Sequence, residues 1–118
     1  MESEYPPGKH LLLDFWGCDR LTDIQLVEKA MEDAAKACGA TILETKLHSF
    51  GEDGGVTGVA ILAESHISIH TWPETAYVAL DVFMCGNCNP NKSIAVFEKY
   101  FSPQERKISE HERGRQNS

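Results

Sequence analysis

Apolar and polar positions repeat with two different periods along the chain, and these periods predict its helices and strands. Between residues 22 and 39 the apolar positions recur at helical spacing, and Gly39 ends the run. Thr22 followed by Gln25 has the pattern of a capping box at the start of this helix. The apolar stripe that we expect to face the core consists of Val27, Ala30, Met31, Ala34, Ala35 and Cys38.

Apolar stretches with β-branched or aromatic residues, some alternating with polar positions, predict strands in other parts of the chain. In residues 41–50 we expect Leu43, Thr45 and Leu47 on one face. Residues 56–71 are too long for an ordinary strand, so their polar centre predicts a break, and Trp72-Pro73 ends the run. The predicted strands are 9–17 (KHLLLDFWG), 41–50 (TILETKLHSF), 56–71 (VTGVAILAESHISIHT), 76–85 (AYVALDVFMC) and 107–112 (KISEHE).

A second helix is expected after Asn89-Pro90, with Ile94, Phe97 and Phe101 on one face. Residues 113–118 (RGRQNS) have the composition of a mobile tail.

The order is therefore β-α-β-β-β-α-β, with the number of middle strands left open. Short connections favour antiparallel pairing, so the expected fold is α+β: a two-layer sandwich of one antiparallel sheet with both helices on one face. The 118 residues fit a single domain, 1–118. Because nothing in the chain covers the other face of the sheet, we expect a homodimer.

Composition narrows the class of partner only slightly. The net charge of −7, from 11 basic and 18 acidic side chains, argues weakly against nucleic acid and anionic membranes. No apolar run reaches transmembrane length, and residues 1–8 lack a signal-peptide pattern, so a cytoplasmic location is expected. The four cysteines, Cys18, Cys38, Cys85 and Cys88, are then expected to be reduced thiols.

The densest polar stretch is AESHISIHTWPE, residues 63–74. A serine or histidine on a strand is most often part of a polar sheet face, but this stretch holds more of them than such a face needs. Ser65 and His70 have opposite parity and span roughly 17 Å in an extended strand, so cooperation between them needs a bend or a second segment. A serine hydrolase is disfavoured because there is no Gly-x-Ser-x-Gly elbow.

Metal and redox sites are weakly indicated. His66 and His70 have i, i+4 spacing, but the stretch is rich in β-branched residues and has no His-Glu-x-x-His motif. Cys85 and Cys88 form a single CxxC without a second pair or a thioredoxin-like setting. We therefore expect no metal.

The central segment GVTGVAILAESHISIHTWPE resembles the small prokaryotic S-adenosylmethionine decarboxylase proenzymes. The pieces KHLLLDFWGCD, AAKACGAT, HSF, ALDVFMCG and EHERGR match in the same order, so the resemblance covers nearly the whole chain. Three details depart from the family pattern. The loop GEDGG is one residue longer, Thr57 replaces a common serine while keeping the hydroxyl, and Cys88 is extra.

The resemblance implies that the chain cuts itself between Glu64 and Ser65. The Ser65 hydroxyl would attack the Glu64 carbonyl, and β-elimination would then release chain 1–64 and leave a pyruvoyl group at the head of chain 65–118. This group would be the only cofactor. It would form a Schiff base with the substrate amine and accept electrons during decarboxylation, a task that a lysine-bound pyridoxal phosphate usually performs.

The implied substrate is S-adenosylmethionine, decarboxylated to the aminopropyl donor for spermidine synthesis. Aromatic faces suit its adenine ring and its sulfonium cation. The family also shares its active site across a dimer. The resemblance assigns processing roles to Thr57 and His70 (the proton acceptor), proton donation in decarboxylation to Cys85, and substrate binding to Phe50, Ile67, Trp72 and Glu74.

Two alternatives remain open at this point. The same scaffold and pyruvoyl chemistry could decarboxylate another amino acid, such as arginine or ornithine. A non-cleaving α/β module that binds a ligand or a partner is the other alternative, which the joint presence of Ser65, Thr57, His70 and Cys85 disfavours. The resemblance gives no role to Glu110 or His111.

Overall fold

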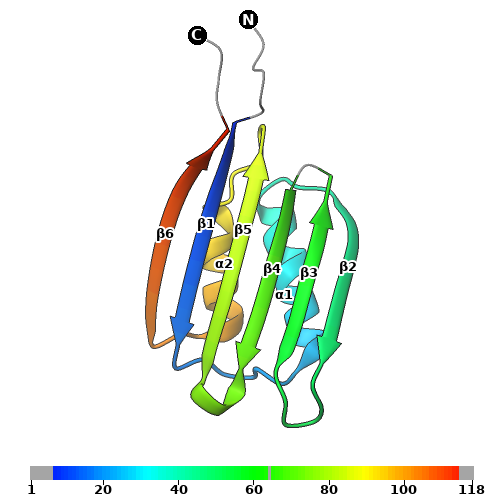
Figure 1. Ribbon diagram of the computed structural model, residues 1–118, viewed down its shortest axis with the longest axis vertical. Coiled ribbons are helices and arrows are strands. Elements are labelled where there is room, and N and C mark those ends of the chain that lie inside the picture. Colours follow the sequence, from blue (N-terminus) through cyan, green and yellow to red (C-terminus); the bar gives the residue numbers. More distant parts are fainter. Residues whose placement is uncertain (1–6, 64, 115–118) are drawn as a thin grey trace, which may run out of the picture.

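The computed structural model describes residues 7–63 and 65–114. It shows a six-stranded antiparallel sheet with two helices packed on one face (Figure 1), which confirms the predicted α+β sandwich. The strand order is β2-β3-β4-β5-β1-β6. The elements are β1 (Gly8–Trp16), α1 (Ile24–Ala37), β2 (Ile42–Ser49), β3 (Val56–Leu62), β4 (Ser65–Trp72), a 3₁₀ turn (Pro73–Thr75), β5 (Tyr77–Cys85), α2 (Lys92–Phe101) and β6 (Glu105–Arg113).

Helix α1 begins one residue later than the capping-box prediction placed it. Asp23, not Thr22, is the N-cap, and its carboxylate accepts a hydrogen bond from the Leu26 N–H at 3.1 Å. The predicted stripe is buried as expected, and Gly39 follows the helix with φ of +83°, where a residue without Cβ is favoured. Either residue can cap a helix by its side chain, so the sequence alone did not decide between them.

The sheet contains one irregularity that the alternation missed. The pairing of β2 with β3 shifts between Ile42 and Glu44, which is the mark of a β-bulge. Leu43 is consequently 64% exposed, whereas Ile42 packs against the core. The prediction that Leu43 shares a face with Thr45 and Leu47 is therefore wrong.

The break predicted within residues 56–71 is confirmed, because β3 and β4 are separate antiparallel strands. Four strands therefore lie between the helices, and β4 ends at Trp72 as expected. Helix α2 begins at Lys92, after a turn in which the Asn89 side chain accepts from the Asn91 N–H at 3.1 Å. The predicted tail is partly wrong, because Arg113 belongs to β6; residues 115–118 lie outside the described part of the chain.

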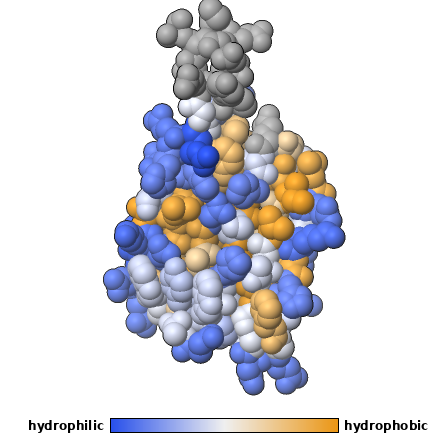
Figure 2. Space-filling model, in the orientation of Figure 1, coloured by the Kyte–Doolittle hydropathy of each residue, from blue (hydrophilic) through white to orange (hydrophobic). Residues whose placement is uncertain are grey.

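The core lies between the sheet and the helices. Phe15, Phe97, Phe101, Leu11 and Met31 are among its largest fully buried side chains. Figure 1 looks onto the opposite face of the sheet, which neither α1 nor α2 covers; we call it the helix-free face. Figure 2 shows that apolar and polar side chains are mixed on this face.

No helix in the described ranges is long and apolar enough to cross a membrane.

Thr71 ties the end of β4 to two other segments through its buried hydroxyl. The hydroxyl donates to the Leu21 carbonyl at 2.8 Å and accepts from the Val56 N–H at 2.8 Å. Thr71 is only 5% exposed, so water cannot readily replace either bond. This single hydroxyl therefore anchors the segment before α1 and the start of β3.

We expect Thr71→Val, which keeps the shape of the side chain, to lower the free energy of unfolding by about 2–6 kcal/mol. The substitution leaves a buried N–H and a buried carbonyl unsatisfied, at about 1–3 kcal/mol each. Urea unfolding of a Ser65→Ala chain, in which the expected self-cleavage cannot interfere, measures the loss. Thr71→Ser keeps the hydroxyl and should lose less stability; equal losses in both variants would contradict this role.

Candidate active site

Alternation along β4 places its polar residues on the helix-free face. His66, Ser68, His70 and Trp72 lie on this face, whereas the residues between them face the core. The registers extend this face across the sheet: His70 is opposite Thr57 on β3 and opposite Ala79 on β5. The candidate residues Thr57, His70 and Trp72 are therefore neighbours by strand pairing.

Thr57 and His70 form the best-defined polar pair among the predicted catalytic residues. The Thr57 Oγ1 and the His70 Nδ1 are 3.0 Å apart, within hydrogen-bond distance. When the hydroxyl donates this bond, Nδ1 has no proton and the proton of the neutral ring lies on Nε2. The pair thus fixes the orientation of an imidazole that is able to exchange protons.

A pocket of about 470 Å³ opens beside this pair and includes the predicted substrate-binding residues Phe50, Trp72 and Glu74. Segments from three parts of the chain form it: the β2–β3 loop, the facing ends of β3 and β4, and the 3₁₀ turn. Its size is within the range of small-molecule sites. The lining residues are Phe50, Asp53, Gly54, Gly55, Thr57, His70, Thr71, Trp72 and Glu74.

An aromatic row borders the pocket, and sequence reasoning missed most of it. Trp72 stacks on Tyr77 with ring centroids 5.2 Å apart, and Tyr77 stacks on Trp16 at 5.8 Å. Burial, together with the hydrogen bond that its hydroxyl donates to Asp14, raises the pKa of Tyr77 to about 12. Tyr77 and Trp16 meet only because β4, β5 and β1 are adjacent, and that pairing cannot be read from local pattern.

Ser65 and Cys85 lie at the other end of the same strands. Ser65 begins β4, and Cys85 ends the neighbouring antiparallel strand β5. The Ser65 Oγ is buried and has no hydrogen-bond partner among the described residues. Cys85 is half-buried, and its sulfur lies over Gly8, where an added Cβ would come within 3.2 Å of it.

The structure separates Ser65 from His70 along one strand. Because β4 runs unbroken from Ser65 to Trp72, the five-residue step between them spans roughly 17 Å. The bend that the sequence left open does not occur. Glu64, the predicted residue before the cleavage point, lies outside the described residues. Ile67 is fully buried on the core side, away from the pocket.

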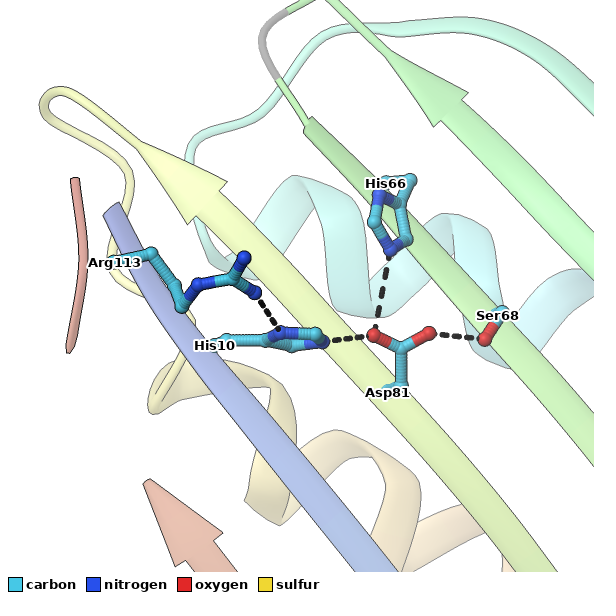
Figure 3. A network of polar contacts seen from close by, with 5 residues as sticks. All are labelled: His10, His66, Ser68, Asp81 and Arg113. Carbon is cyan, nitrogen blue, oxygen red and sulfur yellow. Dashed lines mark hydrogen bonds and ion pairs between the residues drawn. The ribbon is translucent and has the colours of Figure 1, made fainter. Parts of the chain in front are cut away.

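A network of polar side chains occupies the helix-free face between these two ends (Figure 3). Asp81 on β5 is its centre. It accepts hydrogen bonds from the Nε2 of His10 and the hydroxyl of Ser68, and the Nε2 of His66 lies 3.3 Å from its Oδ1. Burial alone would raise the pKa of Asp81, but the hydrogen bonds from Ser68 and His10, together with the electrostatic effect of the two neighbouring histidines, hold that pKa below its ordinary value.

Arg113 orients the imidazole ring of His10. A guanidinium can only donate hydrogen bonds, and the Arg113 Nη1 is 3.3 Å from the Nδ1 of His10. Nδ1 therefore accepts, and the ring proton lies on Nε2, directed at Asp81. His10, His66 and Asp81 are the one group among the described residues with metal-ligand geometry. Here the His10 Nε2 is already a donor beside a fixed positive charge, which disfavours a cation at this place.

The fold and the pocket define a class: a small α+β protein with a pocket of small-molecule size beside an open, polar face of an antiparallel sheet. Residues 9–114 match the family model of S-adenosylmethionine decarboxylase. An S-adenosylmethionine decarboxylase proenzyme from Methanococcus maripaludis is 48% identical over 110 residues, covering 91% of this chain and 89% of that protein. One from Thermomicrobium roseum is 43% identical over 108 residues, covering 91% and 93%.

A solved structure supports the same assignment. The crystal structure of the adenosylmethionine decarboxylase from Aquifex aeolicus superposes with a TM-score of 0.84 at 31% identity, covering 95% of this chain and 94% of that one. The chain belongs to the S-adenosylmethionine decarboxylase family, in its bacterial and archaeal form. The resemblance drawn from the sequence is thereby confirmed.

We expect Asp81→Asn to destabilise the fold at pH 7 by about 1–3 kcal/mol, because it removes a partly buried charge that accepts hydrogen bonds. Since folding lowers the pKa of Asp81, its contribution is complete above the ordinary carboxyl pKa and is lost as the pH falls through the folded-state pKa. The variant should therefore lose less stability than the parent between pH 5 and pH 2. Urea midpoints across this range, in the Ser65→Ala chain, measure the difference.

Glu52→Gln is the control for this experiment, because Glu52 is an exposed carboxylate on the β2–β3 loop. It should leave both the stability at pH 7 and the acid dependence unchanged. An Asp81→Asn variant with the acid dependence of the parent would show that the network does not hold this carboxylate ionised.

Proposed function

We propose that this chain cuts itself between Glu64 and Ser65, and that a pyruvoyl group formed from Ser65 then serves the decarboxylation of S-adenosylmethionine. The product would be the aminopropyl donor for spermidine synthesis. The observation that carries this proposal is the buried Ser65 Oγ without a hydrogen-bond partner in the described part of the chain. Buried hydroxyls are nearly always bonded, so an unbonded one at a strand start near a thiol indicates a reactive group.

The cleavage chemistry needs only groups of the chain and one water. The Ser65 Oγ bonds to the Glu64 carbonyl carbon as the peptide C–N bond breaks, which converts the amide to an ester. Loss of the Ser65 α-proton then breaks the bond between Cβ and the ester oxygen. This releases chain 1–64 with a carboxylate and leaves dehydroalanine at residue 65. Addition of water and loss of ammonia give the ketone.

These steps need a base close to Ser65. Within one chain, His70 lies too far from Ser65 to act as that base. The two residues are roughly 17 Å apart on an unbroken strand. A second copy, packed in the opposite direction against the helix-free face, would bring its His70 and Thr57 to the end of β4 at which Ser65 of the first copy begins that strand. Leu12 and Ile61, exposed by 40% and 41% on this face, would be covered by the same contact. We therefore propose a homodimer with two shared sites.

In such a dimer the substrate would lie between Ser65 of one copy and the pocket of the other. The pyruvoyl group supplies an electron sink for the carbanion that remains after loss of CO₂. Phe50 and Trp72 offer aromatic faces to the adenine and the sulfonium, and Glu74 offers a carboxylate to the ribose hydroxyls. Cys85, at the Ser65 end, would protonate the product carbon. Ile67 faces the core, so we leave it out of this assignment.

The pocket favours this substrate over arginine or ornithine, because neither amino acid has a ring that Phe50 and Trp72 could stack on. Membership of an enzyme family removes the reason to prefer a non-cleaving binding module. The cytoplasmic location expected from the sequence stays a prediction.

Complementation between two inactive chains tests both the cleavage and the shared site. Neither Ser65→Ala nor His70→Ala should cut itself when expressed alone. A mixed dimer would contain one site with Ser65 from the His70→Ala chain and His70 from the Ser65→Ala chain. Denaturing mass analysis should then find fragments 1–64 and 65–118 of the His70→Ala chain, the second without its amine.

Wild-type chain, analysed in parallel, should be cut into the same two fragments. A wild-type chain that stays whole on prolonged incubation would overturn the proposed cleavage. Fragments in the wild type but none in the mixture, with both variants folded by circular dichroism, would overturn the shared site.

Cys85→Ala should cut itself normally but lose about 10²- to 10⁴-fold in decarboxylation rate, the usual effect of a positioned acid. Release of CO₂ from carboxyl-labelled substrate and recovery of the amine product measure this loss. Cys88→Ala is a matched control from the same turn, in which the Cys88 N–H donates to the Cys85 carbonyl at 3.4 Å. Equal activity in the two variants would remove Cys85 from the mechanism.

A further inference from the structure

The loop between β2 and β3 is built as a closed, tight turn. The Phe50 N–H donates to the Gly55 carbonyl at 3.0 Å, and the Gly54 N–H donates to the Gly51 carbonyl at 3.1 Å. Glu52 and Asp53 therefore occupy the two central positions of a four-residue turn.

Two glycines hold this loop close to its surroundings. A Cβ on Gly55 would lie 2.1 Å from the Thr71 carbonyl oxygen, and one on Gly54 would lie 2.3 Å from the Phe50 carbonyl oxygen. Both obstacles are backbone atoms, which cannot move aside as a side chain can. At Gly55 the loop approaches β4 so closely that only glycine fits. Gly54 is packed in the same way against the backbone of Phe50, which fixes the position of the loop relative to this residue.

Asp53 lines the pocket together with Phe50, and Glu52 does not. The pocket wall carries two carboxylates, Asp53 and Glu74, and no lysine or arginine. A carboxylate can only accept hydrogen bonds, so this wall selects groups that donate them. Phe50 and Asp53 line the same pocket from one short loop, so a ring stacked on Phe50 would lie in a pocket that also contains the Asp53 carboxylate.

We propose that Asp53 determines specificity for adenine by accepting a hydrogen bond from its exocyclic amino group. This inference rests on the proposed function, in which Phe50 stacks on the adenine. A purine with a 6-oxo group in place of the amine would direct an acceptor at the carboxylate, and the two like partners would repel. A site built to bond a donor rejects an analogue that lacks the donor.

The test compares the binding of 5′-methylthioadenosine and 5′-methylthioinosine, measured by tryptophan fluorescence and calorimetry on the Ser65→Ala chain. The Ser65→Ala parent should bind 5′-methylthioadenosine at least about tenfold more tightly than 5′-methylthioinosine. A factor of this size corresponds to one hydrogen bond to a charged group. Asp53→Asn should reduce this ratio severalfold, because an amide can donate to the 6-oxo group as well as accept from the amine. Glu52→Gln, the neighbouring carboxylate outside the pocket, should keep the ratio of the parent.

An unchanged ratio in Asp53→Asn, an equal loss of affinity for both compounds, or no binding of either compound to the parent would each overturn the inference. Self-cleavage of Asp53→Asn in the Ser65 background reports that the variant folds. The binding measurement needs no decarboxylation, so the role of Asp53 and the proposed function can be refuted independently of each other. A processed, active enzyme with no Asp53 effect refutes the inference alone, whereas adenine selectivity in a chain that neither cuts nor decarboxylates refutes the proposed function alone.

Discussion

The unbroken hydrogen-bond ladder of β4 between β3 and β5 is the constraint on which the rest of the structure depends. Pairing on both sides keeps the strand straight, so its side chains alternate strictly between the core and the helix-free face. That alternation places His70 and Trp72 beside the pocket and Ile67 in the core. It also keeps Ser65 at the far end, and this separation is the reason that the proposed site needs a second copy of the chain.

Local pattern was sufficient for features that depend on neighbours in sequence. The buried stripe of α1, the break before Ser65 and the end of β4 at Trp72-Pro73 follow from periodicity and from the chemistry of proline. The errors are also local: two adjacent residues can both cap α1, and a bulge moves Leu43 out of phase. One extra residue in a strand leaves no mark in composition.

The resemblance named the candidate site residues, and the structure showed which of them lie together. What sequence reasoning missed depends on strand order. Tyr77, Trp16 and the Asp81 network come from strands that are far apart in the chain and adjacent in the sheet. A histidine on β1 and an aspartate on β5 give no local signal that they will meet. Asp53 was overlooked for a different reason, because an acidic residue in a glycine-rich loop looks like ordinary turn composition.

The strand order determines how the two fragments would be held together after the proposed cleavage. Chain 1–64 would contribute β1, β2 and β3, and chain 65–118 would contribute β4, β5 and β6. Because β1 lies between β5 and β6, three of the five strand pairings would join the two pieces: β3–β4, β5–β1 and β1–β6. The halves are interleaved and cannot separate without dismantling the sheet. Once unfolded, they would have to find each other by diffusion, so maturation would turn a unimolecular folding reaction into a bimolecular one. The chain would have to fold before it is cut, and dilution would oppose its recovery from denaturation.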